Sequence, residues 1–193
     1  MLQFVEHESR RLRLIAWQER HIAPFIAMNS DPEVMRYFPS LIDEAQSRAS
    51  IEFWMNQFSE RGWSNWAVEL KDTGEFIGFV GLWTPKLTMP FSPCVEIGWR
   101  LARRFWRQGY ATEGAKASLK VGFEQLGLSE VVSYTALSNT PSRAVMERIG
   151  MRNTARDFDH PAVPIGHPLR RHCLYKITRE EWARSSEGRT TIS

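Results

Sequence analysis

The chain of 193 residues is long enough for one domain with a substantial core, and a second domain is not expected. Its hydrophobic content of 42% and charged content of 24% are typical of a folded globular protein. The net charge of +3 is too small for the strongly basic surface of a dedicated nucleic-acid-binding protein.

The first sixty residues combine one strand pattern with helical patterns. Residues 10–17 alternate in polarity and predict a strand. The helical pattern that follows is interrupted at residues 30–32, because proline disfavours helix in the residue before it. Asp43 and Gln46 have the spacing of a capping box, which predicts a helix over residues 44–62.

An antiparallel meander is predicted next. Residues 64–70 and 75–83 are strand patterns on either side of the turn sequence KDTG, residues 71–74. A loop with three prolines, residues 84–93, leads into a third strand over residues 94–101.

The second half alternates between helix and strand. A helix is predicted to begin near Tyr110, and a strand over residues 130–137 follows it. The sequence NTPSRAVMERIG, residues 139–150, predicts a helix with Thr140 as N-cap and Pro141 at its first position.

A late strand is predicted over residues 170–178. The order of elements indicates a mixed α/β fold, formed by a single domain over residues 1–182. Residues 183–193 are expected to be a flexible tail.

The stretch RRFWRQGYATEG, residues 103–114, places arginines and glycine where a helix begins. The first turn of a helix has N–H groups without intrahelical partners, and Gly109 lets the backbone approach a ligand closely. With Arg103, Arg104 and Arg107 nearby, these groups predict a cradle for a phosphate or pyrophosphate. The alternative is a solvated arginine face beside an ordinary loop glycine.

Other phosphate-binding motifs fit less well. GYATEG, residues 109–114, has the form GxAxxG of a dinucleotide fingerprint, but Glu130 begins the next predicted strand instead of ending it. No GxxxxGK[ST] loop occurs in the chain.

Cys94 and Cys173 are the only cysteines, and no Cys or His spacing typical of a metal site occurs. A disulfide scaffold and a metal are therefore not expected, and a reducing compartment fits. No apolar run has the length of a membrane span, and the N-terminus lacks a signal-peptide pattern. A cytoplasmic location without membrane contact is expected.

Five motifs, in order, resemble the GNAT superfamily of acyl-CoA-dependent N-acetyltransferases, and most closely its ribosomal-protein alanine acetyltransferase (RimJ/RimL-like) branch. They are distributed over nearly the whole chain and are NSDPEVMRYFP (29–39), VEIGW (95–99), WRQGYA (106–111), NTPSRAVMERIGM (139–151) and LYKITREEW (174–182). The family writes its pyrophosphate loop Q/R-x-x-G-x-G/A, and this chain departs from it with Trp106 at the first position.

The resemblance implies a strongly bent, mostly antiparallel sheet flanked by helices. Its fourth and fifth strands, residues 94–101 and 130–137, would splay apart to admit the pantetheine arm of acetyl-CoA. A homodimer is common in such families and is a further expectation. The residues that the resemblance assigns to coenzyme A are Ile97, Gly98, Trp99, Arg104, Arg107, Gln108, Gly109, Tyr110, Ala111, Thr112, Asn139 and Ser142.

Glu96 is the candidate general base, since it alternates with Val95 and Ile97 on its strand and so leaves the face that they occupy. The alternative is a structural glutamate. Ser142 is a candidate hydrogen-bond donor to the leaving thiolate, or an ordinary serine of a first helical turn. Tyr134 is a candidate acid or substrate contact, or a packed core tyrosine.

The segment between the late strands offers other titratable groups, which could bind a cationic amine or carry its proton. The alternative is a mobile polar loop. The groups are Asp157, Asp159, His160, His167 and His172.

The expected acceptor is a primary amine, with a protein N-terminus favoured. An α-amino group has a pKa near 7.7–8 and is neutral far more often at pH 7 than a lysine side chain, whose pKa is near 10.4. Related enzymes also acetylate antibiotics, polyamines and amino acids, so a small-molecule acceptor stays open. Direct attack in a ternary complex is expected, because neither cysteine lies in a nucleophile–base motif.

Two other classes of function stay open. A non-catalytic acyl-CoA-binding module would keep the cradle and lose nothing when Glu96 or Ser142 is replaced. A nucleic-acid-binding protein that uses the arginine cluster would show binding that weakens steeply with salt.

Overall fold

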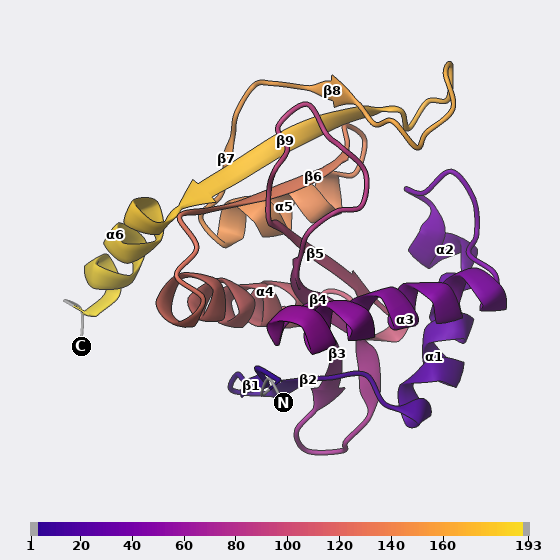
Figure 1. The fold of residues 1–193 in the computed structure, drawn as a ribbon, viewed down its shortest axis with the longest axis horizontal. Helices are drawn as coiled ribbons and strands as arrows, with labels where there is room; N and C mark the ends of the chain where they lie inside the picture. Colours follow the sequence, from indigo (N-terminus) through magenta and orange to yellow (C-terminus); the bar gives the residue numbers. More distant parts are fainter. Residues whose placement is uncertain (1–3, 191–193) are drawn as a thin grey trace.

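The computed structural model describes residues 4–190, with side chains up to residue 185. Within that part, nine strands form one mixed sheet in the order β1-β2-β3-β4-β5-β6-β9-β7, with β8 paired to β9 (Figure 1). The strands are β1 (His7–Glu8), β2 (Leu12–Ile15), β3 (Asn65–Leu70), β4 (Phe76–Trp83), β5 (Glu96–Leu101), β6 (Glu130–Ala136), β7 (Arg152–Asn153), β8 (Phe158–Asp159) and β9 (Arg171–Thr178).

Helices flank this sheet, as the sequence predicts for a mixed α/β fold (Figure 1). A 3₁₀ turn, η1, precedes α4, and a π-helical turn, η2, continues it. The helical elements are α1 (Glu19–Asn29), α2 (Pro32–Met35), α3 (Glu44–Arg61), η1 (Arg103–Phe105), α4 (Tyr110–Lys120), η2 (Val121–Gln125), α5 (Thr140–Arg148) and α6 (Arg179–Thr190).

The two faces of the central strand β4 are covered by different helices. Phe79 contacts the ring of Trp54 on α3, with 4.8 Å between the ring centroids. Val80 faces α4, where a Cβ on Gly114 would lie 3.1 Å from it, so glycine allows the helix to pack this close. Burial on both sides explains why the sequence of β4 is a nearly continuous apolar run.

In the first half of the chain, helices and strands begin and end where the local sequence signals predict. Asp43 and Gln46 make both hydrogen bonds of the capping box that opens α3. The interruption at residues 30–32 separates α1 from α2, whose N-cap is Asp31. The turn at residues 71–74 joins the antiparallel strands β3 and β4.

The strands β5 and β6 meet at a single position. They are the only parallel neighbours among the described strands, and their register contains the one pair Glu96↔Val132. The N–H of Val132 donates to the carbonyl of Val95 at 2.9 Å, and beyond this point the two strands separate. The sequence predicts that residues 94–101 and 130–137 splay apart, and the separation of β5 and β6 confirms this.

Three details differ from the sequence prediction. Asn139, not Thr140, is the N-cap of α5, because its side chain accepts a hydrogen bond from the N–H of Ser142 and Thr140 is already helical. The short strands β1, β7 and β8 were not predicted, since two residues carry too little periodicity. The expected flexible tail, residues 183–193, overlaps α6; its last three residues lie outside those described, and its flexibility stays a prediction.

No helix of the described part combines the length and the apolar character needed to cross a lipid bilayer.

Candidate functional site

A cavity of about 1410 Å³ opens where β5 and β6 separate, bounded also by α2, α5 and the loop before α4. It is larger than most pockets that hold one small ligand, so it has room for two substrates. Most residues predicted for the site line it, namely Glu96, Gly98, Trp99, Arg107, Gly109–Thr112, Tyr134, Asn139 and Ser142.

Three of the residues that the resemblance assigns to coenzyme A do not line this cavity. The side chain of Ile97 is fully buried in the core. Gln108 donates from its side chain to the carbonyl of Arg104 at 3.0 Å, and the Arg104 guanidinium pairs with Glu75. Arg103, whose charge the sequence had also placed near the cradle, does line it.

The loop before α4 has the backbone form of an anion cradle. Arg107 and Gly109 both adopt left-handed conformations, with φ of 61° and 81°. Such residues turn successive N–H groups toward one side of the loop. The first turn of α4 begins directly after Gly109 and adds N–H groups at the positive end of the helix dipole.

Arg11, which directly precedes β2, holds this loop in place through its side chain. Its Nη2 donates to the carbonyl of Gln108 at 3.0 Å, and its Nε lies 2.7 Å from Oε2 of Glu113 in the first turn of α4. Its guanidinium also lies 4.3 Å from the ring centroid of Tyr110. Burial alone would raise the pKa of Glu113, but hydrogen bonds from Ser9 and Arg11 outweigh burial and lower it.

Trp106 shows why the first position of the loop motif tolerates a departure. Its indole N–H donates to the carbonyl of Leu101 at 2.7 Å, so the side chain ties the loop back to the end of β5. The cradle itself is formed by backbone groups, which do not depend on this side chain.

Glu96 is the buried carboxyl group of the cavity wall. Burial raises its pKa to about 8, although the Tyr134 hydroxyl and the Trp83 indole N–H oppose the shift. Its Oε2 is buried and has no hydrogen-bond partner among the described residues. A carboxylate with this pKa is a stronger base than an ordinary glutamate and is poised near neutral pH.

Tyr134 joins Glu96 to an aromatic cluster on β8 and β9. Burial, and then the charge of Glu96, raise the pKa of Tyr134 strongly, so its hydroxyl stays protonated. Its ring centroid lies 5.8 Å from that of His160 and 6.3 Å from that of His172, and both histidines line the cavity. Burial lowers the pKa of His160 to about 4, with the charges of His172 and Arg170 adding to the shift.

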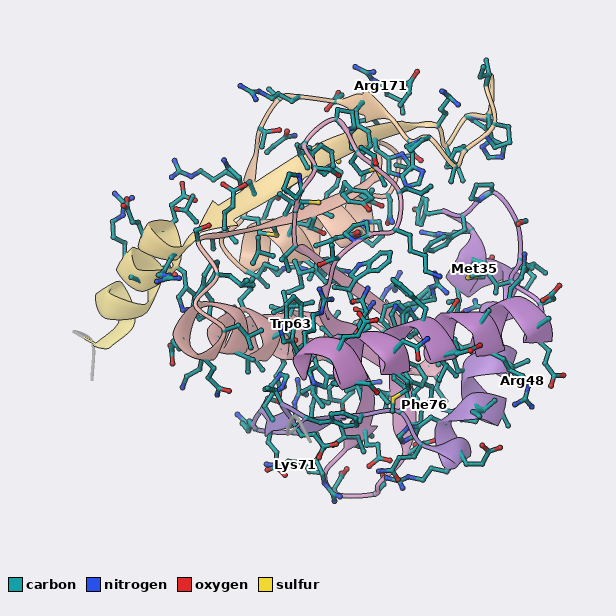
Figure 2. All side chains as sticks on the ribbon, in the orientation of Figure 1. Met35, Arg48, Trp63, Lys71, Phe76 and Arg171 are labelled. Atoms are coloured by element: carbon teal, nitrogen blue, oxygen red, sulfur yellow. The ribbon has the colours of Figure 1, made fainter. Side chains whose placement is uncertain are left out.

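The other groups of the late segment lie apart from this wall. Asp159 pairs with Arg170 and with Arg171, and Arg171 lies at the outer edge of the molecule (Figure 2). His167 accepts a hydrogen bond from the N–H of Leu169 within its own turn. Asp157, Asp159 and His167 do not line the cavity.

Neither cysteine resembles an activated nucleophile. Burial, and then the charge of Glu96, raise the pKa of Cys94 to about 11. Burial also raises the pKa of Cys173. A thiol with a raised pKa forms little thiolate at neutral pH and is a poor nucleophile there.

Sequence reasoning did not find Arg11, Arg100 or Arg148 as parts of the site. Arg100 and Arg148 line the cavity, and Arg11 holds the loop beside it. Arginine is common on surfaces, and no short motif marks these three; only their place in the fold distinguishes them.

Comparison with known proteins agrees with this geometry. A family profile for the acetyltransferase (GNAT) domain matches residues 11–152. The FsC-acetyl coenzyme A-N(2)-transacetylase of Aspergillus fumigatus is 32% identical, over 95% of this chain and 80% of the fungal protein. The Bacillus subtilis protein YkkB is 35% identical, over 78% of this chain and 88% of its own.

Among solved structures, a GNAT-family acetyltransferase from Bacillus anthracis matches with a TM-score of 0.74 and 28% identity, over 91% of this chain and 99% of that one. The family profile covers well over half of the residues, and the fungal relative extends the similarity over nearly all of them. The family expected from the sequence motifs is thus confirmed. The chain belongs to the GNAT family of acetyltransferases, enzymes that transfer an acyl group from acetyl-CoA to an amine.

Proposed function

We propose that this acetyltransferase transfers the acetyl group of acetyl-CoA to a primary amine by direct attack in a ternary complex, with Glu96 as general base. The observation that carries the proposal is the gap between β5 and β6. It begins at the pair Glu96↔Val132, and the cavity that it opens extends to the anion cradle before α4. A long thioester can therefore lie with its phosphates at one end and its acyl group beside the base.

The residues present fit coenzyme A. The N–H groups from Arg107 to Thr112 would hold the pyrophosphate, with the charges of Arg103 and Arg107 adding to the attraction. Backbone groups over residues 97–99 would bond the pantetheine amides, since β5 has no partner strand on this side beyond Glu96. The bound molecule supplies an activated thioester carbonyl.

Asn139 is proposed to bond the pantetheine arm, and its other hydrogen bonds hold its side chain in place. Its Oδ1 accepts a hydrogen bond from the N–H of Ser142 at 3.3 Å, and its Nδ2 donates to Oγ1 of Thr135 at 2.8 Å. One N–H of the amide remains for the pantetheine arm. The capping role fixes its orientation at the cavity wall.

The chemistry follows from three side chains. The neutral amine nitrogen attacks the thioester carbonyl and forms the new C–N bond, the C–S bond breaks, and coenzyme A leaves as a thiolate that takes its proton from solvent. Glu96 takes the proton that the amine loses, because its raised pKa makes it a competent base near pH 8. Tyr134 and Ser142 are the candidate hydrogen-bond donors to the leaving sulfur, and Tyr134 keeps its proton because its pKa is raised.

The acceptor is proposed to be an α-amine, with a protein N-terminus favoured, as in the RimJ/RimL-like branch that the sequence motifs resemble. At pH 7 such an amine is neutral roughly one-tenth of the time, against about 0.04% for lysine. A small-molecule amine is the second candidate. It is favoured by the fungal relative, whose name describes acetyl transfer to N(2) of FsC.

Thiol release from acetyl-CoA tests the proposal with peptides that have free or blocked N-termini, with lysine side chains and with small amines. We expect saturable turnover with free α-amines and little with blocked peptides. Silence across the whole panel, together with tight coenzyme A binding, would identify an acyl-CoA-binding module instead. Glu96→Gln should lower this turnover by roughly 10²–10⁴. Its control for loss of a carboxylate is Glu44→Gln, on the exposed first turn of α3.

A further inference from the structure

Arg100 lies in the wall of the same cavity, and no carboxylate in the part of the chain that the structure describes forms an ion pair with it. It stands on β5 opposite Phe79, and its guanidinium lies 4.2 Å from the ring centroid of Phe38 and 5.5 Å from that of Phe79. Its Nη1 donates to Oδ1 of Asn29 at 2.7 Å. These are neutral partners, and they fix the position of the guanidinium without neutralising its charge.

The charge of Arg100 is costly where it lies. No ion pair among the described residues includes it, and its Nε is buried without a hydrogen-bond acceptor. Burial lowers its pKa to about 10, so the side chain is still cationic at neutral pH. A guanidinium has five N–H donors, and one accepted bond leaves Nη2 and part of Nη1 for a ligand. A desolvated cation of this kind favours an anion that enters the cavity.

Arg100 and Glu96 lie on the same face of β5. Glu96 is paired with Trp83 and Arg100 with Phe79, and both partners face α3, where they contact Phe53 and Trp54. Since side chains alternate along a strand, residues four apart share a face, and their Cα atoms are about 13 Å apart.

Gly98 is the residue between them on this face, and it leaves the space above the strand open. A Cβ placed there would meet only Oε1 of Glu96 at 3.9 Å and Nε1 of Trp83 at 4.0 Å. Gly98 lines the cavity together with Glu96 and Arg100. An acceptor can therefore lie across the glycine and reach both charged groups.

We propose that Arg100 binds a carboxylate of the acceptor whose amine is presented to Glu96, which makes the acceptor an amine with a carboxylate roughly 10 Å away. This rests on the proposed function and adds the substrate class. Short peptides with free termini, linear ω-amino acids and protein N-termini with an acidic side chain at that distance have this form. Lys86 and Arg36 line the same cavity, so its charge disfavours a polyamine.

The test compares each acid with its own carboxamide. The pairs are triglycine, 4-aminobutyrate, 6-aminohexanoate and 8-aminooctanoate with the corresponding amides, and the readout is kcat/KM for acetyl transfer. In the wild-type enzyme we expect the best acid to exceed its amide by at least about tenfold, as a charged hydrogen bond gives. The preference should be largest where chain length matches the span from Glu96 to Arg100.

Variants of Arg100 test whether this residue causes the preference of the enzyme for the acid over its amide. Arg100→Gln should bring the ratio of acid to amide close to one by lowering kcat/KM for the acid alone. Arg100→Lys, which keeps the charge and loses the planar fork, should retain part of it. Arg48→Gln, an exposed position on α3, is the matched control and should leave the ratio unchanged.

Several outcomes would overturn the assignment. Equal rates for acid and amide in the wild-type enzyme do so without any variant, even if Arg100→Gln fails to fold. Equal loss for acid and amide in a folded Arg100→Gln enzyme gives Arg100 a structural role. A raised Kd for coenzyme A in that variant assigns Arg100 to the cofactor phosphates. Failure of the proposed function is different, because no amine of either kind would then be acetylated.

Discussion

At the residue scale, the surroundings of Glu96 decide what its carboxyl group can do. An exposed glutamate with a pKa near 4.5 is ionised at neutral pH but is a weak base. Burial beside Trp83 and Tyr134 raises the pKa of Glu96 to about 8, which is close to the pKa of an α-amine. Proton transfer between groups of similar pKa is efficient, so the same burial that costs stability favours catalysis.

The rate of transfer should therefore depend on the ionisation of Glu96. With an acceptor amine whose pKa is above about 9.5, the slope of log kcat/KM against pH should fall from about two to one near pH 8. Glu96→Gln should lower the rate by roughly 10²–10⁴ and keep a slope of one throughout. Initial rates from pH 6 to 9 measure both. A variant with a wild-type rate and profile would exclude Glu96 as the base.

The contribution of Glu96 to the free energy of unfolding should fall as pH rises, whereas its contribution to the rate of transfer should increase. Because the folded pKa of Glu96 is above its ordinary value, the folded protein holds this proton more tightly than the unfolded chain. Its contribution is present below about pH 4.5 and is lost as pH rises through about 8, with an upper bound of about 5 kcal/mol. Urea unfolding should show Glu96→Gln gaining stability over the wild type between pH 5 and 9. A difference that is constant with pH would contradict the raised pKa.

At the scale of elements, the loop at the start of α4 is held in place by Arg11, a residue that lies next to β2 and far from α4 in the sequence. The two left-handed residues Arg107 and Gly109 give the loop its shape, and Arg11, which directly precedes β2, holds both sides of that loop in place. A loop that is ordered before binding loses less entropy when a ligand arrives. The cradle is thus a joint product of a helix terminus and a distant strand.

Arg11→Ala should weaken coenzyme A binding through the loop, since Arg11 contacts the loop and is not proposed to contact the ligand. We expect Kd to rise by about tenfold, because the carbonyl of Gln108 loses its side-chain donor and the carboxylate of Glu113 loses the guanidinium, keeping only Ser9 and the backbone N–H of residue 11. Isothermal titration measures the change, and Arg13→Ala, two residues further along in β2, is the control. An unchanged Kd in a folded variant would show that the loop holds its shape without the brace.

At the scale of the whole molecule, one sheet is divided into two parts by the separation of β5 and β6. Helices α1 and α3 cover one face of the first part, and α4 packs against the other. Beyond Glu96 the two strands share no ladder pair, so ladder groups there remain for a ligand. A molecule bound in the gap would join the two parts of the sheet.

Acetyl-CoA should therefore stabilise the fold globally. At a free concentration of 100 times Kd, binding adds about 2.7 kcal/mol to the free energy of unfolding. For a domain of this size that corresponds to a rise in Tm of roughly 5–10 °C. Thermal unfolding at increasing acetyl-CoA measures the shift, and adenosine at the same concentrations is the control. A Tm that does not respond would contradict binding in the gap.

Much of the fold was predictable because its signals are local. The capping box of Asp43 and Gln46, the turn at residues 71–74 and the glycine before α4 act through neighbours within four residues. The N-cap of α5 was misassigned by one position, since Asn139 and Thr140 are both good caps and only the backbone conformation distinguishes them.

The sequence by itself determined the order of the longer strands and helices, and it made the loop before α4 and Glu96 candidates for the site, because each depends on residue types at short spacing. Tertiary structure alone decided the single ladder pair at which the gap between β5 and β6 begins and the raised pKa of Glu96. It also decided the contacts of Arg11 with Glu113 and of Arg100 with Asn29, residues 102 and 71 positions apart. The physical reason is that burial and ion pairing depend on what packs around a group, and chain folding brings those neighbours from distant positions.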